Sequence, residues 1–155
     1  MADSRRQALV TALKAILQTI QVANGYETDA GLNVFEWRGY DIPESKLPAL
    51  DVRDGEELLK PDAGAADRHE MIVEINCFAA DPASPALLRK IIADVVKAIG
   101  ADPAFPRIGG VAEDVNFVQQ GITEIEHDER FVTAGQVGIT IEFMTGHFDP
   151  YQGGN

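Results

Sequence analysis

The residues of this chain best suited to chemistry are a short acidic run around one histidine. His127 is flanked by carboxylates at Glu124, Glu126, Asp128 and Glu129. Carboxylate oxygens and an imidazole close together in sequence are donor types that a divalent metal accepts. An exposed hairpin tip of solvated charges explains the same residues, and no second cluster with ligand spacing accompanies them. We therefore interpret the run as a hairpin tip and predict no metal site.

Other reactive residue types also lack the partners that catalysis requires. Cys77, the single cysteine, lies in a strand-like run of alternating apolar residues, which predicts a core position. A nucleophilic thiol would need a nearby base and partial exposure. The run 67–70 has varied charges but no nucleophile, and the glycine pairs 109–110 and 153–154 lack the Lys-Ser/Thr of a phosphate loop. We predict no catalytic residue and no cofactor.

The composition indicates one acidic domain. The 155 residues include 25 Asp and Glu against 13 Lys and Arg, which gives a net charge of −12. Such a balance disfavours a surface that grips nucleic-acid phosphates, although simple solubility explains it too. No apolar run is long enough to cross a membrane, and we expect no signal peptide. Residues 1–145 are expected to fold as one domain.

The first elements are predicted from helical periodicity and then from alternation. Ser4 and Gln7 have capping-box spacing, an apolar stripe predicts a helix over 5–22, and Asn24-Gly25 is expected to cap it. Strands are predicted over 34–38 and again from about residue 50 to a turn at Asp54-Gly55. The composition of 61–67 predicts a projecting hairpin loop.

The second half begins with the clearest early strand, predicted over 70–79. Ser84 suits the N-cap and Pro85 the first position of a helix, and the apolar stripe that follows predicts a helix ending at Gly100. Antiparallel strands are predicted over 115–125 and 131–144. Gly135 and Gly138 within the last strand indicate a bulge or a close backbone approach.

This order predicts an α+β fold, with a mostly antiparallel sheet and two helices packed on one face. The other face is expected to carry Trp37, Ile72 and Phe78 among polar residues, which suggests association with another copy of the protein. Residues 146–155 are polar and glycine-rich. We expect an extended C-terminal tail that docks on a neighbour through Phe148 and Tyr151.

The pattern as a whole resembles the tail terminator proteins of long, non-contractile-tailed, lambda-like bacteriophages. The resemblance covers most of the chain and is carried by turn and strand signals rather than by a reactive motif. The segments that carry it are the N-terminal helix, Gly25-Tyr26 with 28–31, 47–49 with 52–56, the helix start at 81–84, and the last strand followed by 149–151.

The resemblance implies a homo-oligomer, a hexameric ring at the head-proximal end of the virion tail, made in the host cytoplasm. Such a ring caps the tail tube, stops its polymerisation and provides the head-tail joining surface. The tube protein would bind one face and the connector or neck protein the other. DNA would pass through an acidic lumen without specific binding, and neither an enzymatic activity nor a membrane is implied.

The contacts between subunits or with partners are expected from charged and aromatic residues in turns and at the terminus. In the 51–57 run, salt bridges to an adjacent subunit and a solvated strand and turn both remain open. The candidate interface residues are Arg38, Arg53, Asp54, Glu56, Asp62, Phe148, Asp149, Pro150 and Tyr151. Two alternatives stay open: a neck or tail-completion protein of the connector, and a small ligand- or metal-binding domain with its site at the His127 hairpin.

Overall fold

The computed structural model describes residues 2–38, 42–61, 64, 66–80, 84–127 and 130–153. The side chains of 61, 125–127 and 130–132 lie outside this description. In chain order the helices and strands are α1 (Arg5–Leu17), β1 (Val34–Glu36), β2 (Ala49–Pro61), β3 (Ala66–Phe78), α2 (Pro85–Ala101), β4 (Ala112–His127) and β5 (Arg130–Gly146). Short 3₁₀ turns at Val22–Asn24, Ala30–Leu32, Glu44–Lys46 and Ile108–Gly110 connect them.

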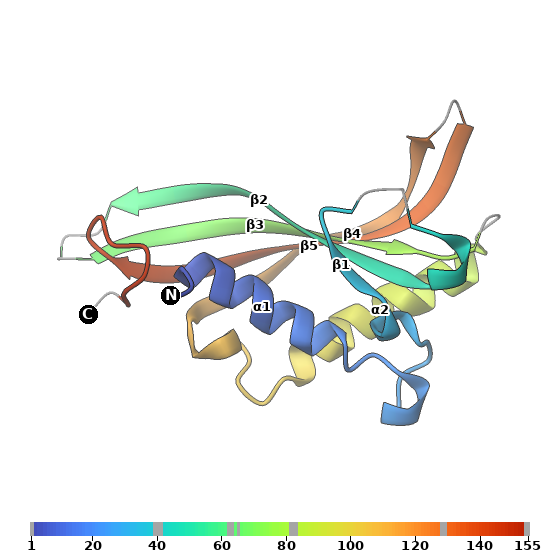
Figure 1. Cartoon of the computed structure of the whole chain (residues 1–155), viewed down its shortest axis with the longest axis horizontal. Helices are drawn as coiled ribbons and strands as arrows, with labels where there is room; N and C mark the ends of the chain where they lie inside the picture. Colours follow the sequence, from blue (N-terminus) through green and yellow to red (C-terminus); the bar gives the residue numbers. More distant parts are fainter. Residues whose placement is uncertain are drawn as a thin grey trace.

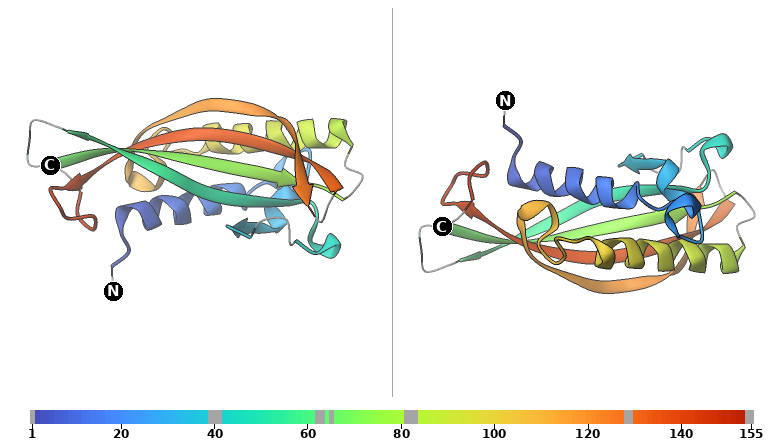
Figure 2. Two further views of the ribbon diagram at one scale, coloured as in Figure 1. Left: turned by 90° about the horizontal axis from the view of Figure 1, so that it is seen from above. Right: turned by 90° about the horizontal axis from the view of Figure 1, so that it is seen from below.

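The strands of the described chain form one five-stranded sheet in the order β1-β2-β3-β5-β4. Every pair is antiparallel except β1 with β2, which is parallel. Both α1 and α2 lie on the same face of this sheet (Figures 1 and 2). The predicted α+β fold, with helices on one face of a mostly antiparallel sheet, is therefore confirmed.

The core lies between that face and the two helices. Alternate residues of β3 and β5 point into it, as the alternation of apolar residues predicts. Its fully buried side chains include Leu9, Leu13 and Leu17 from α1, Leu88, Ile91 and Val95 from α2, and Met71, Val73, Ile75, Val137, Ile139 and Ile141 from the sheet.

Helix α1 begins as predicted but ends early. The Ser4 hydroxyl accepts a hydrogen bond from the Gln7 amide at 3.1 Å, which caps the first turn. The α-helix ends at Leu17, not at residue 22, and the chain continues through a 3₁₀ turn at Val22–Asn24. Gly25 has the predicted left-handed conformation, with φ of 88°, but it caps this short turn.

The predicted turn at Asp54-Gly55 is wrong. Strand β2 continues to Pro61, and its register with β3 shifts between Asp54 and Glu57, which marks a bulge. The physical reason is a distant cation: the Arg6 guanidinium donates to the Gly55 carbonyl at 2.7 Å. The irregular backbone is thus satisfied inside a long strand, so the chain does not need to reverse there.

The remaining elements agree with prediction in type and differ at their ends. Helix α2 follows Ser84 and carries Pro85 in its first turn. A Cβ on Gly135 would lie 3.0 Å from Ile92 of α2, and Gly138 faces the register shift in β4, so both glycines mark the close approach or bulge predicted for them. Strands β4 and β5 are longer than predicted, and their hairpin bends away from the helices at one end of the sheet (Figure 1).

The uncovered face of the sheet is less apolar than expected. Trp37 is 59% exposed and Ile72 is half-buried, but Phe78 is only 5% exposed, opposite Ala49 at the end of β3. The C-terminal segment also differs from an extended tail. Residues 147–152 turn back on β5, where the Gly146 amide donates to the Gln152 carbonyl at 2.9 Å.

Candidate interaction surfaces

The face of the sheet opposite the helices carries a ladder of paired charges. Lys60 of β2 contacts Glu70 of β3 and, at 3.1 Å, Glu142 of β5. Arg68 lies 3.9 Å from the same Glu142 carboxylate. These side chains share one face because each is one step out of phase with the buried residues of its strand. Cross-strand pairs of this kind are partly exposed and contribute little stability individually.

Apolar side chains lie among these charges without a described cover. Leu58 is 51% exposed and Val118 is 59% exposed. Val118 lies beside the position that a Gly138 side chain would occupy, on the same face as Thr140 of β5. The face is therefore a mixed surface of paired charges, polar groups and separate apolar side chains.

A second cluster surrounds Asp51, and it contains two of the predicted interface residues. Asp51 is fully buried on the uncovered side and accepts hydrogen bonds from the Arg38 amide at 2.9 Å and Arg53 Nε at 3.0 Å. The Arg53 guanidinium also lies 5.5 Å from the centre of the exposed Trp37 ring. Arg38 and Arg53 thus make contacts within their own subunit, where they order the segment after β1.

Asp54, also predicted as an interface residue, joins α1 to the bulge of β2. The Arg6 guanidinium contacts Asp54 at 2.8 Å and Glu57 at 3.0 Å, and the Trp37 indole donates to Asp54 at 3.0 Å. Burial raises the pKa of Asp54, but the hydrogen bonds from Trp37 and Arg6 outweigh it, so this pKa lies below its ordinary value. Glu56, between these two carboxylates, is exposed.

The contacts of Glu57 continue to His69, which the sequence analysis did not single out. His69 faces the other carboxylate oxygen of Glu57, contacts Thr145 Oγ1 through Nε2 at 2.8 Å, and stacks on Phe143 with centroids 4.9 Å apart. Arg6 was missed because its partners on β2 lie about fifty positions away, and His69 because Phe143 and Thr145 lie more than seventy positions away. Helical periodicity places Arg6 outside the apolar stripe of its helix, and it cannot identify a partner on a distant strand.

The C-terminal turn is held by one carboxylate on β3. The Asp67 carboxylate accepts hydrogen bonds from His147 Nδ1 at 2.9 Å and from the Phe148 amide at 3.2 Å. The hydrogen bond from His147, followed by the one from the Phe148 amide, lowers the pKa of Asp67. The Pro150 carbonyl accepts a hydrogen bond from the Arg5 amide at 2.9 Å. The turn is therefore held by hydrogen bonds at both of its ends.

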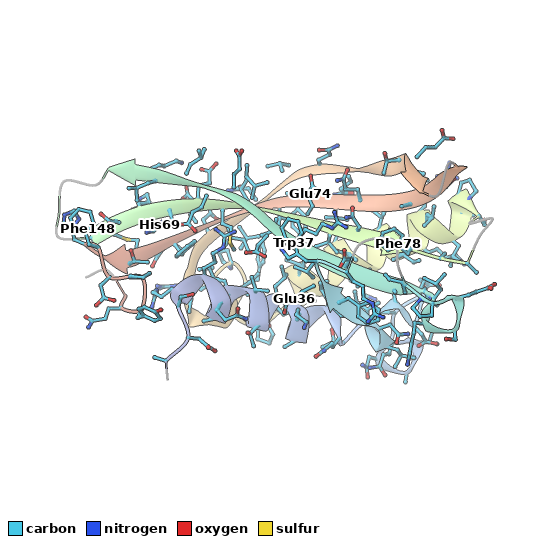
Figure 3. All side chains as sticks on the ribbon, turned by 45° about the horizontal axis from the view of Figure 1, so that its top comes forward. Glu36, Trp37, His69, Glu74, Phe78 and Phe148 are labelled. Atoms are coloured by element: carbon cyan, nitrogen blue, oxygen red, sulfur yellow. The ribbon has the colours of Figure 1, made fainter. Side chains whose placement is uncertain are left out.

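Phe148 and Tyr151 are displayed by this turn and not packed into the subunit. Phe148 is 85% exposed, with φ of 56°, and Tyr151 is 58% exposed. Asp149 accepts from the Tyr151 amide at 3.1 Å and so fixes the turn locally. The structure therefore brings Phe148, Asp149, Pro150 and Tyr151 together at the end of the sheet where Figure 3 shows Phe148.

The other predicted features have separate outcomes. Cys77 is buried, and burial raises the pKa of its thiol to about 12. Among the described residues, no group of three or more metal-ligating side chains gathers in one place. The acidic cluster around His127 is not included in that finding, because Asp128, Glu129 and the His127 side chain lie outside the described part. Asp62 of the predicted loop also lies outside the described residues.

No protein-family model matches the chain, and no curated protein matches it. In the part of the chain that the structure describes, no helix has the length and apolar character needed to span a bilayer.

Proposed function

We propose that this chain is a phage tail terminator, a structural protein whose copies close into a ring on the head-proximal end of the tail tube. The proposed ring, most simply a hexamer, stops addition of tube subunits and offers its other face to the head-tail connector. The proposed role uses no catalytic residue and no cofactor. Its support is the sequence resemblance together with the surfaces described above.

The observation that carries the proposal is the one-sided sheet. Both helices cover a single face, and the opposite face extends over all five strands of the described chain with no helix upon it (Figure 1). The resemblance to tail terminators implies that the sheets of the ring face the lumen and the helices lie outside. A subunit with this layering has a broad, twisted sheet face for the lumen and two sheet ends for its neighbours.

The charges of the uncovered face are compatible with DNA passage. Glu70, Glu74 and Glu142 lie on it, and Lys60 and Arg68 are engaged by carboxylates. A phosphate backbone binds through cations, and a cation already paired with a carboxylate is less available to it. We therefore expect DNA to slide across this face with little retention at physiological salt.

Contacts along the tail axis are assigned to the two projecting hairpins. The β2–β3 hairpin extends past the start of α1, and the β4–β5 hairpin bends away from the helices at the other end (Figures 1 and 2). In the proposed ring the subunits lie obliquely, so that each end of the sheet meets a neighbouring copy while the hairpin tips reach beyond that contact, one toward the tube and the other toward the connector. Glu56 and Leu59 are exposed on the first of these hairpins.

Electron microscopy of phage lacking this gene tests the proposal. A terminator predicts tails of uncontrolled length that do not join heads, and complementation with the intact gene should restore one length. Tails of normal length that stay separate from heads would overturn termination and favour the neck or completion role. Normal, joined particles would overturn both structural roles. Native mass measurement of the purified protein with tube subunits would give the ring number.

A further inference from the structure

The C-terminal turn presents a rigid aromatic knob, formed by residues 147–151. A non-glycine residue with positive φ is conformationally costly, and here the hydrogen bond from the Phe148 amide to Asp67 holds that backbone in place. The Phe148 ring is 85% exposed in spite of this constraint. The ring lies against the His147 ring of the same turn, with centroids 3.8 Å apart, but a large ring left so exposed contributes little to the stability of the subunit. It is well suited to act as an anchor that a partner buries.

An apolar hollow of about 390 Å³ lies at the edge of the sheet, between α2 and β4. Ile92 and Ala93 of α2 and Ile122 of β4 supply its apolar lining, and Arg89 is exposed at its rim. Ile122 is 37% exposed, although it belongs to the helix-facing side of its strand. We name this feature the α2–β4 hollow, which is lined by Arg89, Ile92, Ala93, Gln120, Gly121 and Ile122.

The knob and the hollow lie at opposite ends of the subunit. Ile122 pairs with Gly135, which pairs with Cys77, whereas the knob is held by Asp67 of the same strand. The separation along β3 is 77 − 67 = 10 residues, or about 33 Å at the usual rise of a strand. Figure 3 agrees, with Phe148 and Phe78 near opposite ends. A subunit therefore cannot fill its own hollow with its knob, but a second copy can.

The two surfaces are complementary in chemistry as well as in position. The knob carries the carboxylate of Asp149 beside the aromatic ring, and the hollow carries the Arg89 guanidinium beside aliphatic side chains. A guanidinium is attracted to the face of an aromatic ring and to a carboxylate. Two different patches that meet head to tail form the heterologous type of contact, which closes into a ring when the rotation permits.

We propose that Phe148 of each copy inserts into the α2–β4 hollow of the next copy, with Arg89 over the ring and facing Asp149. This contact rests on the proposed ring function and names the residues that join its subunits. The contact also gives a reason for the hydrogen bonds from the C-terminal turn to Arg5 and Asp67, because a knob that is already ordered loses less conformational entropy when it docks.

Cysteine cross-linking of the full-length protein tests the pairing directly. We expect Phe148→Cys mixed with Ile122→Cys to give a disulfide-linked pair on oxidation, and the double variant to give a ladder of linked chains. Native Cys77 is buried and should not react. Either single variant alone should remain unlinked. Failure of the double variant to link under conditions in which the wild-type protein forms rings would overturn the contact.

Two substitutions and two matched controls give an independent readout. Phe148→Ala should raise the protein concentration needed for ring formation about 30-fold, the effect of losing an interface hot spot. Ala93→Trp, at an exposed helix position, should block the hollow and have a similar effect. The controls are Leu32→Ala, which removes another exposed side chain, and Gly100→Trp, at an open position elsewhere on α2. Both should assemble as the wild-type protein does.

The outcomes separate this inference from the proposed function. Wild-type rings that persist unchanged in Phe148→Ala and Ala93→Trp would overturn the contact and leave the ring function standing. A wild-type protein that forms no ring, even with tube subunits present, would overturn the ring function and the contact with it. Circular dichroism of each variant checks that the subunit remains folded.

Discussion

At the scale of single residues, a buried carboxylate on α2 connects this helix to the loop that follows α1. Asp94 is 2% exposed and accepts hydrogen bonds from the Glu27 amide, the Thr28 amide at 2.8 Å and the Thr28 hydroxyl at 2.8 Å. It fixes the loop after α1 against α2. Its three donors come from one short turn, which therefore has a defined conformation without regular secondary structure.

Replacement of this anchor should be costly. Asp94→Ala leaves the Thr28 amide and hydroxyl buried without their acceptor, so we expect the free energy of unfolding to fall by about 2–4 kcal/mol. Urea denaturation followed by circular dichroism measures it. Glu44→Ala, at an exposed position, is the control and should change the same quantity by less than about 0.5 kcal/mol. Equal effects of the two substitutions would contradict this account of Asp94.

The carboxylate of Asp54 gives a prediction about pH. Its folded pKa lies below the ordinary value of 3.8, so it contributes stability that is fully present above that value and is lost as pH falls through the lower folded pKa. We expect Asp54→Asn to be less stable than wild type at pH 7. The difference should shrink progressively below about pH 4, because protonation of Asp54 then removes the same charge from the wild-type protein.

Unfolding free energies of both proteins between pH 7 and pH 2.5 measure this effect. Glu56→Asn is a suitable control, since Glu56 is the exposed neighbour within the same bulge. A wild-type advantage over Asp54→Asn that stayed constant down to pH 2.5 would show that the Asp54 charge contributes nothing to it.

At the scale of elements, the join between α1 and the bulge of β2 determines how the N-terminal helix sits on the sheet. Arg6 binds Asp54, the Gly55 carbonyl and Glu57 from a helix that is otherwise held by its apolar stripe. The bulge and the helix therefore depend on one another. Without the cation, two carboxylates would face each other across an irregular stretch of strand.

Removal of Arg6 should therefore destabilise the contact between α1 and the bulge of β2, and not only one surface ion pair. We expect Arg6→Met to lower the free energy of unfolding by about 1–2 kcal/mol, a range already reduced for the partial exposure of the group. Lys14→Met on the same helix breaks the Lys14–Glu36 pair and should cost less than about 1 kcal/mol. Amide hydrogen exchange should show faster opening at residues 54–57 only in the Arg6 variant.

The elements also show what the sequence was able to predict. Apolar periodicity identified both helices, the face of β3 and β5 that meets them, and the α+β class, because these depend on local pattern alone. The early end of α1, the continuation of β2 through Gly55 and the parallel pairing of β1 depend on distant residues or on register. A dipeptide such as Asp54-Gly55 has the same signature in a turn and in a bulge.

For the candidate surfaces too, the sequence predicted some residues and only the fold revealed others. Phe148 and Tyr151 were predicted because large aromatic residues in a polar terminus are conspicuous in any sequence. The fold adds Asp67 and His147, which decide that this terminus forms a turn and not an extended tail. Arg38 and Arg53 were predicted as contacts with a neighbour; within the subunit both bind Asp51, the Arg53 guanidinium from the same face of its strand and the Arg38 amide from thirteen positions away, and only the second contact lies beyond local pattern.

At the scale of the whole molecule, net charge opposes any assembly of identical copies. Each subunit carries −12 at neutral pH, so the approach of two copies is repelled at long range. The proposed knob and hollow contact offers a favourable charge pair only at short range. Salt screens the long-range repulsion over about 10 Å at 0.1 M, whereas a largely apolar contact is affected less.

This balance predicts that ring formation improves with salt. We expect the protein concentration needed for rings to fall when NaCl is raised from about 0.02 M to about 0.3 M, as the Debye length shortens from roughly 20 Å to below 8 Å. Sedimentation velocity over a concentration series measures it. The double variant Glu27→Gln/Glu44→Gln removes two exposed charges, giving −12 + 2 = −10, and should assemble more readily than wild type at low salt but equally at high salt. Assembly that weakens with salt would contradict this account, since attraction between complementary charges would then dominate the approach of the subunits.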